Sequence, residues 1–370
     1  MSSGAPRVPP GPPVPPVRAS RLRRRKRERR RRGIELLIAV AVVALGVSYA
    51  TTQIGDEVAA DGKTGPTPPG PRAPALLALS FTGAPKPLLA IIGTAGSPPA
   101  AMGVPQGLRL EVPGAGELTT RRVAALPGPG LQVALSNVIG AWAADYAVTD
   151  LPRVAALLDR EGGLRVELPD PVSVRNEVVG PGAVTMTGQQ VADYLGAEGQ
   201  NTFTRWEIVL GGMLASPPRL RATDLTETDD LGGAQATLDG AMGGRLETLP
   251  VRIGSATIRI PDYAALDRLM ADRFGVKRTP VPVIVQNAVG IPGVGADVGR
   301  LLIPKGFRVA LSQNAVSFGL KRTRVTALGE DNLGAARRVR VALGVGRIAV
   351  SQVASGFGDV QIEVGKDFTA

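Results

Sequence analysis

The sequence predicts a protein of the α/β class, with a single N-terminal transmembrane helix, a layered α/β domain and a small C-terminal domain of order βαββαβ. Three observations predict this organisation. An uncharged apolar stretch follows an Arg-rich segment near the N-terminus. Short apolar runs bounded by Gly and Pro then alternate with segments of helical spacing. The same alternation starts again near residue 278.

Residues 1–33 are predicted to form a disordered cytoplasmic arm. Seven prolines among residues 1–20 disfavour helix and sheet and favour polyproline II. The arm contains eleven Arg and one Lys against one Glu, which equals the net charge of +11 of the whole chain. Residues 34–370 are therefore neutral overall, with 31 basic and 31 acidic residues.

Residues 34–54 are predicted to form the transmembrane helix. No residue from Leu36 to Ile54 is charged, and at 1.5 Å per residue this stretch reaches roughly 28 Å, close to the roughly 30 Å of a bilayer core. Because Arg clusters stay on the cytoplasmic side, the N-terminus is predicted inside the cell and the later domains outside it. The alternatives are a signal peptide cleaved after Ala50 and a buried core helix. The Arg cluster either sets this topology and attracts anionic lipid or binds nucleic acid, and we favour the first interpretation.

The outer part begins with a Gly/Pro-rich linker, residues 55–75, and continues with the layered domain, residues 76–245. Strands are predicted at 74–81, 86–95, 108–114, 145–151 and 164–172. Helices are predicted at 131–140, 152–163, 187–196 and 201–215. Pro152 suits the first position of its helix, and Thr187 is the predicted N-cap of the next.

The C-terminal part is predicted as a connector, residues 246–277, followed by a separate domain, residues 278–370. The connector contains a predicted helix at 261–275. In the domain, strands are predicted at 281–290, 307–313, 323–329, 347–352 and 359–365, and helices at 295–306 and 331–344. Asp331 is the predicted N-cap of the last helix. Gly290 and Gly293 are predicted to hold the turn before the first helix.

The composition excludes several kinds of chemistry. The chain has no Cys and no His, which removes disulfides, thiol nucleophiles, Cys/His zinc sites and Ser-His-Asp triads. Aromatic residues make up 4% of the chain, so base-stacking platforms are not expected. With neutral outer domains, the sequence predicts no nucleic-acid partner, which leaves a DNA-binding regulator as the weakest hypothesis. It also predicts no cofactor or metal, unless the chain is an active Mg²⁺-dependent transferase.

A glycine motif follows the strand predicted at 281–290. Gly293, Gly295 and Gly299 follow a strand and open a helix, as in a dinucleotide-binding loop. Their spacing is GxGxxxG, and no acidic residue ends the next strand. We therefore interpret the motif as a tight strand-to-helix turn.

Two segments carry a family resemblance. DYAVTDL (145–151), the helix and strand that follow it, and PGAVTMTGQQVADY (181–194) resemble the LytR-CpsA-Psr family of cell-envelope proteins, over residues 76–245. VIVQNAVGIPGVGADVGRLLIPKGFRV and the closing DVQIEVGKDF resemble the LytR C-terminal domain. The resemblance covers most of the chain beyond the linker, and the family also has a single N-terminal anchor. With the Ala-, Gly- and Arg-rich composition, it points to an actinobacterium.

The resemblance implies a transferase that moves an undecaprenyl-pyrophosphate-linked glycopolymer to peptidoglycan. The family binds the pyrophosphate and a divalent metal with an early Arg-Ser-Asp, an Ile-Pro-Arg-Asp after a strand, and Arg residues near a "RieRQ" helix. This sequence departs at nearly all of these places. Matching segments are Ala84-Pro85-Lys86-Pro87-Leu88, Val112-Pro113-Gly114-Ala115-Gly116 and Leu195-Gly196-Ala197-Glu198-Gly199.

Arg205 is the one basic residue that matches the family's set, without the Arg-Gln that should follow it. The resemblance implies that Arg205 contacts phosphate, and Arg121 and Arg122 are further candidates to replace lost charge. The structural alternative is a helix-packing or solvated Arg at each position. An apolar lipid pocket lined by residues 76–95 and 131–139 is also expected.

The predicted function is therefore that of a membrane-anchored extracellular protein of cell-envelope assembly, catalytically degenerate and acting by binding or scaffolding. Its expected partners are membrane lipid, a polyprenyl-linked glycopolymer and cell-envelope proteins. The alternative is an active phosphotransferase whose catalytic groups have moved.

Overall fold

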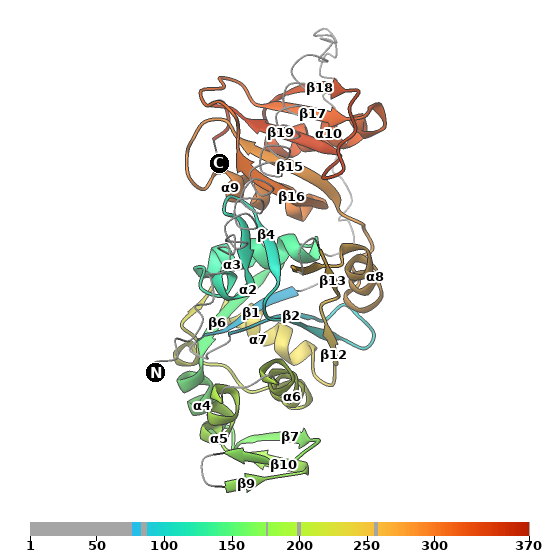
Figure 1. Cartoon of the computed structure of the whole chain (residues 1–370). Helices are drawn as coiled ribbons and strands as arrows, with labels where there is room; N and C mark the ends of the chain where they lie inside the picture. Colours follow the sequence, from blue (N-terminus) through green and yellow to red (C-terminus); the bar gives the residue numbers. More distant parts are fainter. Residues whose placement is uncertain (1–75, 83–86, 175–176, 198–200, 255–257, 370) are drawn as a thin grey trace, which may run out of the picture. The chain divides into compact units, whose positions relative to one another are not determined.

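The computed structural model of the chain describes residues 76–82, 87–174, 177–197, 201–254 and 258–369 (Figure 1). The predicted arm, transmembrane helix and linker, residues 1–75, lie outside the described residues. Within the ranges that are described, no helix is both long enough and apolar enough to cross a bilayer.

The first domain is built on a mixed six-stranded sheet of order β11-β6-β1-β2-β3-β12 (Figure 1). Its strands are β1 (Leu76–Thr82), β2 (Leu88–Gly93), β3 (Ala100–Val104), β6 (Asp145–Asp150), β11 (Glu227–Thr228) and β12 (Arg245–Thr248). β1 pairs antiparallel with β2 and parallel with β6, and β12 pairs parallel with β3.

Both faces of this sheet are buried, as the continuous apolar runs predict. Along β1, Leu77, Leu79 and Phe81 pack into one hydrophobic cluster, whereas Leu76 and Ala78 pack into another. Because successive side chains of a strand point to opposite faces, the two clusters lie on opposite sides of the sheet. We call them the lower and the upper core, respectively, as they appear in Figure 1.

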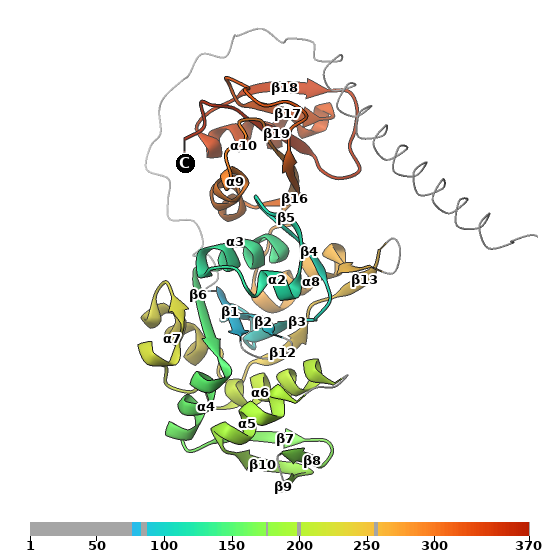
Figure 2. The same ribbon diagram turned by 60° about the vertical axis from the view of Figure 1, so that its left-hand side comes forward.

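Seven helices accompany this sheet in the described part of the first domain. The lower core is completed by α4 (Leu151–Arg160), α5 (Gly188–Gly196), α6 (Thr202–Ala215) and α7 (Leu231–Gly240). The upper core is completed by α2 (Thr120–Val123), α3 (Gly128–Ile139) and α8 (Tyr263–Phe274). Figure 2 shows α4, α5 and α6 below the sheet and α2, α3 and α8 above it.

Local sequence signals set where these helices begin. Asp150 caps α4 through the Arg153 N–H, with Pro152 in the first turn. Thr187 and Gln190 form a reciprocal capping box at the start of α5. The start of α5 agrees with the sequence prediction, and α4 begins one residue earlier than predicted, so that Pro152 is its second residue.

Short two-stranded ribbons complete the first domain. They pair β4 (Arg109–Val112) with β5 (Gly116–Thr119), β7 (Leu164–Leu168) with β10 (Gly182–Met186), β8 (Val172–Val174) with β9 (Glu177–Val179), and β13 (Val251–Ile253) with β14 (Arg259–Pro261). A 3₁₀ turn, Ala222–Asp224, precedes β11. Residues 246–277, predicted as a connector, contribute Leu249, Leu266, Met270 and Phe274 to the upper core.

The C-terminal domain has a five-stranded sheet of order β16-β15-β19-β17-β18. Its elements are β15 (Val281–Asn287), α9 (Val294–Leu302), β16 (Phe307–Asn314), β17 (Arg324–Leu328), α10 (Leu333–Leu343), β18 (Arg347–Ser351) and β19 (Val360–Val364), with 3₁₀ turns at Ile303–Lys305 and Glu330–Asn332. The order is βαββαββ, so all five strands predicted for this domain are present, and the predicted formula βαββαβ left one of them out. Asp331 lies in the second 3₁₀ turn and Asn332 is the N-cap of α10, because the helix begins two residues later than predicted.

Helices α9 and α10 cover one face of this sheet. Val298 of α9 and Val339 of α10 share a core with Val283, Val309 and the other strand residues whose side chains point to the same face of the sheet. Side chains that point to the other face form polar pairs: Gln361 donates to Gln286 at 3.2 Å, and Arg324 donates to Glu363 at 3.1 Å. Gly290 and Gly293 have φ angles of +78° and +87°, as the predicted turn requires.

Edge strand β16 is joined to the first domain by side chains. The Asn137 amide of α3 donates to Val309 O at 2.9 Å and accepts from Val309 N at 2.7 Å. Arg308 makes two hydrogen bonds to Asp267 of α8, and Ser312 N donates to Glu111 Oε1 at 2.6 Å. Burial raises the pKa of Glu111 to about 7, and the nearby Glu117 adds to the rise.

Candidate functional site

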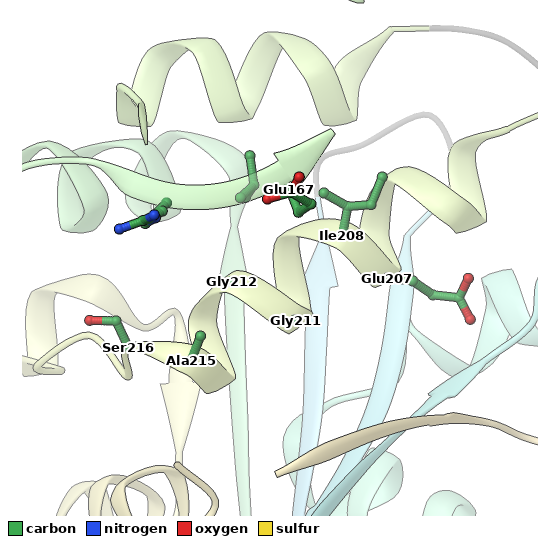
Figure 3. Close-up of a pocket in the computed structure, with 9 residues that line it drawn as sticks. Glu167, Glu207, Ile208, Gly211, Gly212, Ala215 and Ser216 are labelled. Carbon is green, nitrogen blue, oxygen red and sulfur yellow. The ribbon is translucent and has the colours of Figure 1, made fainter. Parts of the chain in front are cut away.

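A groove of about 440 Å³ runs between α6 and β7 in the first domain (Figure 3). The nine residues that line it are Arg165, Val166, Glu167, Glu207, Ile208, Gly211, Gly212, Ala215 and Ser216. Figure 3 shows the side chain of Glu167 on β7, the side chain of Glu207 on α6, and the bare backbone of Gly211 and Gly212 farther along α6. The volume is within the range typical of small-molecule sites.

Two adjacent glycines in α6 form the groove for different reasons. A Cβ atom at Gly212 would lie 2.7 Å from Arg165 O, so this glycine lets the helix approach β7 closely. A Cβ atom at Gly211 would meet nothing within 4 Å, so this glycine leaves open space. Neither feature was found from the sequence, although a Gly-Gly pair inside a helix, which lowers helix propensity, is the signal that could have revealed it.

Carboxylates outnumber cations along the groove. Arg165 is its one basic lining residue, against Glu167 and Glu207. Glu207 Oε1 accepts a hydrogen bond of 2.6 Å from Thr248 Oγ1 at the end of β12. The apolar lining comes from Val166, Ile208 and Ala215. The groove therefore combines an apolar floor with a negative charge balance.

Arg205 is used within the protein. Its guanidinium donates to Ala197 O at 2.7 Å and to Tyr194 O at 3.3 Å, which are carbonyls at the end of α5. It also lies over the Tyr194 ring, 5.4 Å from the centroid. Cations are favourable at a helix C-terminus, because the last carbonyls there lack backbone partners. Arg205 thus holds α5 against α6.

Arg121 and Arg122 lie on the other side of the central sheet. Both are exposed on α2, which completes the upper core through Val123. Arg205 is on α6, which completes the lower core through Trp206. The three candidate Arg residues are therefore not brought together.

The predicted match to the family's Ile-Pro-Arg-Asp, residues 112–116, lies in a two-stranded ribbon outside the central sheet. β3 of the central sheet ends at Val104, and Pro105-Gln106-Gly107 follow directly. Residues 112–116 instead form the turn of the β4–β5 ribbon, where Gly114 N donates to Ser312 Oγ at 2.8 Å. At either place this chain lacks the Arg-Asp pair.

The same end of β3 lies beside α6. A Cβ atom at Gly103 would meet the Phe203 ring at 3.1 Å, and Gly103 pairs with Thr248, the partner of Glu207. In the family's "RieRQ" pattern, Ile208 stands where the second Arg is expected.

The expected apolar pocket between residues 76–95 and 131–139 is filled in the described part of these segments. Leu77, Leu89 and Ile91 are fully buried in the sheet, and Leu131 and Leu135 of α3 are fully buried against it. The α6 groove is lined by neither segment.

Acidic residues gather near the start of β6 without forming a metal site. The pKa of Asp145 is raised by burial and by the nearby Asp230 and Asp229. Glu227 accepts from Gly128 N at the start of α3, at 2.8 Å. Over the ranges that the structure covers, no group of three or more acidic side chains is arranged to hold a metal ion.

Comparisons with known proteins identify the C-terminal domain. Residues 280–368 match the family described as "LytR cell envelope-related transcriptional attenuator". No curated protein matches the chain.

Several solved structures are similar to the chain in fold. Bacillus subtilis TagV has 11% identity, a TM-score of 0.44, and coverage of 55% of this chain and 96% of its own. A structure titled LytR-CPS2A-psr family protein YwtF (TagT) with bound octaprenyl pyrophosphate lipid has 12% identity, a TM-score of 0.45, and coverage of 55% and 92%. A transcriptional regulator from Enterococcus faecalis has 14% identity, a TM-score of 0.42, and coverage of 53% and 84%.

The C-terminal match agrees with the sequence and with the βαββαββ fold. The predicted resemblance of the C-terminal part is thus confirmed, and residues 280–368 form a domain of the cell-envelope-related LytR type.

Proposed function

We propose that this protein is a membrane-anchored extracellular component of cell-envelope assembly that binds a polyprenyl-linked glycopolymer or its lipid without transferring it. The family match of residues 280–368 supports the place of action. The uncharged stretch 36–54 after an Arg cluster supports the anchor and the topology.

The main support for a loss of glycopolymer transfer is the charge balance of the α6 groove. A pyrophosphate brings two to three negative charges, and its transfer needs fixed cations or a metal held by carboxylates. Arg165 is the one basic lining residue, and Glu167 and Glu207 would repel the anion. Arg205 is occupied by two carbonyls of α5.

The apolar part of the groove supports retained lipid binding. Val166, Ile208 and Ala215 offer apolar contacts, and the open space at Gly211 admits a chain alongside α6. An isoprenoid chain gains affinity from such burial with no need for cations. Binding is therefore expected to depend weakly on Mg²⁺.

A transfer assay tests the loss of catalysis. The full chain, in detergent with a polyprenyl pyrophosphate-linked saccharide, an acceptor peptidoglycan fragment and Mg²⁺, is expected to release no product above the protein-free control. Measurable transfer that falls about 100-fold in Arg205→Ala or Arg122→Ala would instead establish the alternative, an active phosphotransferase with a rebuilt site.

A filled-groove variant tests lipid binding. Gly211→Leu places a side chain in the open space and is expected to weaken binding of a fluorescent polyprenyl phosphate at least about tenfold, which corresponds to roughly 1.4 kcal/mol. Gly334→Leu is the matched control, because it also lies in a helix with no atom within 4 Å of its Cβ position. Equal binding by both variants would remove the groove as the lipid site.

A reporter fusion tests the topology. An enzyme that is active only outside the cytoplasm, fused after Ala370, is expected to be active, and neutralising the Arg cluster at 21–32 is expected to reduce this activity. Activity of a cytoplasm-only reporter at the same position would contradict the proposal. The mass of the mature N-terminus decides whether cleavage occurs after Ala50.

A further inference from the structure

All five strands of the C-terminal sheet end or begin at one side of the sheet, and loops gather there. β15, β16 and β19 run parallel and end at this edge, whereas β17 and β18 run the other way and begin there. The loops 288–293, 315–323 and 365–368 therefore lie together (Figure 1). We call this the platform edge. The loop 352–359, between β18 and β19, lies at the opposite edge.

Exposed apolar side chains stand on the platform edge. Ile291 is 60% exposed, Val316 is 86% exposed and Phe318 is 58% exposed. The Phe318 ring packs on Gly290, where a Cβ atom would lie 3.4 Å from it, so Phe318 and Ile291 belong to adjoining loops. Large apolar side chains grouped on a surface mark an interaction site.

Cations surround these apolar side chains. Lys321, Arg322, Arg347 and Lys366 are exposed at the same edge, and within the described part of the chain the structure pairs none of them with a carboxylate. The two acidic residues there are engaged: Glu363 pairs with Arg324 at 3.1 Å, and Asp367 Oδ1 accepts from Thr323 N and Thr323 Oγ1, both at 2.7 Å.

The opposite edge carries the reverse charge. Glu330 and Asp331 lie in the 3₁₀ turn after β17, and Asp359 precedes β19. Residues 281–370 have eleven basic and six acidic residues. The platform edge therefore combines four cations that have no carboxylate partner in the described part of the chain with three exposed apolar side chains, whereas the opposite edge carries three carboxylates together with Lys305, Val353 and Phe357.

Backbone hydrogen bonds fix the platform loops to one another. Gly319 N donates to Ala288 O at 2.7 Å, Lys366 N donates to Leu320 O at 2.9 Å, and Arg347 N donates to Thr323 O at 2.9 Å. The Asn287 side chain accepts from Gly290 N and donates to Ile291 O. A surface that is already ordered loses little conformational entropy on binding.

We propose that the platform edge docks the C-terminal domain onto an anionic lipid bilayer, with Phe318, Ile291 and Val316 entering the headgroup boundary and Lys321, Arg322, Arg347 and Lys366 contacting lipid phosphates. Apolar side chains among cations suit a surface that is apolar below and negative above. A soluble polyanion would use the cations and would leave the three apolar tips in water. The inference rests on the proposed anchorage, because an anchored chain keeps this domain close to a bilayer.

Tryptophan quenching by brominated lipids tests the proposal with the full chain and an excess of vesicles. Phe318→Trp is the probe, and Phe357→Trp is its matched control, since Phe357 is 72% exposed at the opposite edge of the same sheet. Wild-type protein gives the background from Trp142 and Trp206. In vesicles rich in phosphatidylglycerol, the added fluorescence at 318 is expected to fall by about half and that at 357 to stay unchanged.

Charge variants separate the two parts of the surface. Lys321→Gln with Arg322→Gln is expected to lower the ratio of docked to free domain about 30-fold, at roughly 1 kcal/mol per cation. Lys305→Gln with Arg338→Gln removes the same two residue types, with Lys305 before β16 and Arg338 stacked on Phe307 at its start, and is expected to change nothing.

Equal quenching at 318 and 357, no quenching at 318, or quenching at 318 that ignores the anionic lipid content would each overturn the proposal. Anchorage is read separately, from flotation of the chain with vesicles after a high-pH wash. Loss of flotation with quenching intact would contradict the anchor and leave the platform edge supported.

Discussion

The two described domains use their sheets differently. The six-stranded sheet of the first domain is buried on both faces, whereas the five-stranded sheet of the C-terminal domain has helices on one face and polar pairs on the other. Their charges differ as well. Residues 76–280 have 18 basic and 21 acidic residues, and residues 281–370 have eleven and six.

This difference bears on where the protein meets anions. The α6 groove of the first domain is apolar and negatively balanced, and the platform edge of the C-terminal domain presents unpaired cations. In our proposals the first domain therefore recognises a lipid chain, and the C-terminal domain recognises lipid phosphate. The first domain's sheet, closed on both faces, supports a rigid groove, and the second domain supplies the charged surface.

The largest expected effect comes from cutting the ion pair between the domains. Arg308 is 6% exposed and its partner Asp267 is 17% exposed, so Arg308→Ala leaves a poorly solvated carboxylate and is expected to reduce the free energy of unfolding by about 3 kcal/mol. Chemical denaturation measures it. Arg300→Ala, which cuts an exposed pair with Asp297, is the control and is expected to cost less than about 1 kcal/mol. Equal losses would show that the junction contributes no more than a surface pair.

The neighbouring glycines of α6 give the next effect. Gly212→Ala places a Cβ 2.7 Å from Arg165 O and is expected to destabilise the first domain by about 1–3 kcal/mol through overpacking. Gly211→Ala meets open space and is expected to stabilise the helix by up to about 1 kcal/mol, because alanine is the better helix former. Thermal unfolding separates them. The same sign for both variants would contradict the packing of α6 on β7.

A smaller effect is expected at the turn before α9. Gly293 has φ of +87° and open space around its Cβ position, so Gly293→Val is strained by its backbone alone. A loss of about 1–2 kcal/mol is expected from the left-handed conformation. Gly334→Val, in the first turn of α10 with equally open space, is the comparison by denaturant unfolding, and an equal loss there would point to β-branching instead of φ.

The smallest effect concerns pH. Burial raises the pKa of Glu111 from its usual 4.5 to about 7. A carboxyl group whose pKa is higher in the folded state stabilises the fold below pH 4.5 and loses that contribution as pH rises through 7. The melting temperature is expected to fall between pH 5 and 8. Glu111→Gln keeps the acceptor for Ser312 N and is expected to flatten this slope with little change at pH 5. An unchanged slope would remove Glu111 as its source.

The sequence predicted most helices because their signals are local. Caps at Asp150 and Thr187, and glycine ends such as Gly344, lie within a few residues of the elements they bound. Several short strands were not predicted from the sequence. Ala100–Val104 contains no alternation, and β12 pairs with it from almost 150 residues away, so its place in the sheet depends on tertiary contacts.

The candidate site was predictable in residue type and not in position. Arg205 matched a motif, but its guanidinium is used by Tyr194 O and Ala197 O, which the sequence does not place beside it. The α6 groove depends on how closely Gly212 approaches Arg165, which is a distance between a helix and a strand. Such a contact leaves no periodic signal.

The amide of Asn137 acts on β16 as a neighbouring strand would. An edge strand offers free N–H and C=O groups to any other extended chain, which is a common start of aggregation. Asn137 occupies both groups of Val309, and Glu111 takes Ser312 N. The first domain thereby covers β16, one of the two outermost strands of the C-terminal sheet. Self-association through an added strand would then have to use β18, the outermost strand on the other side.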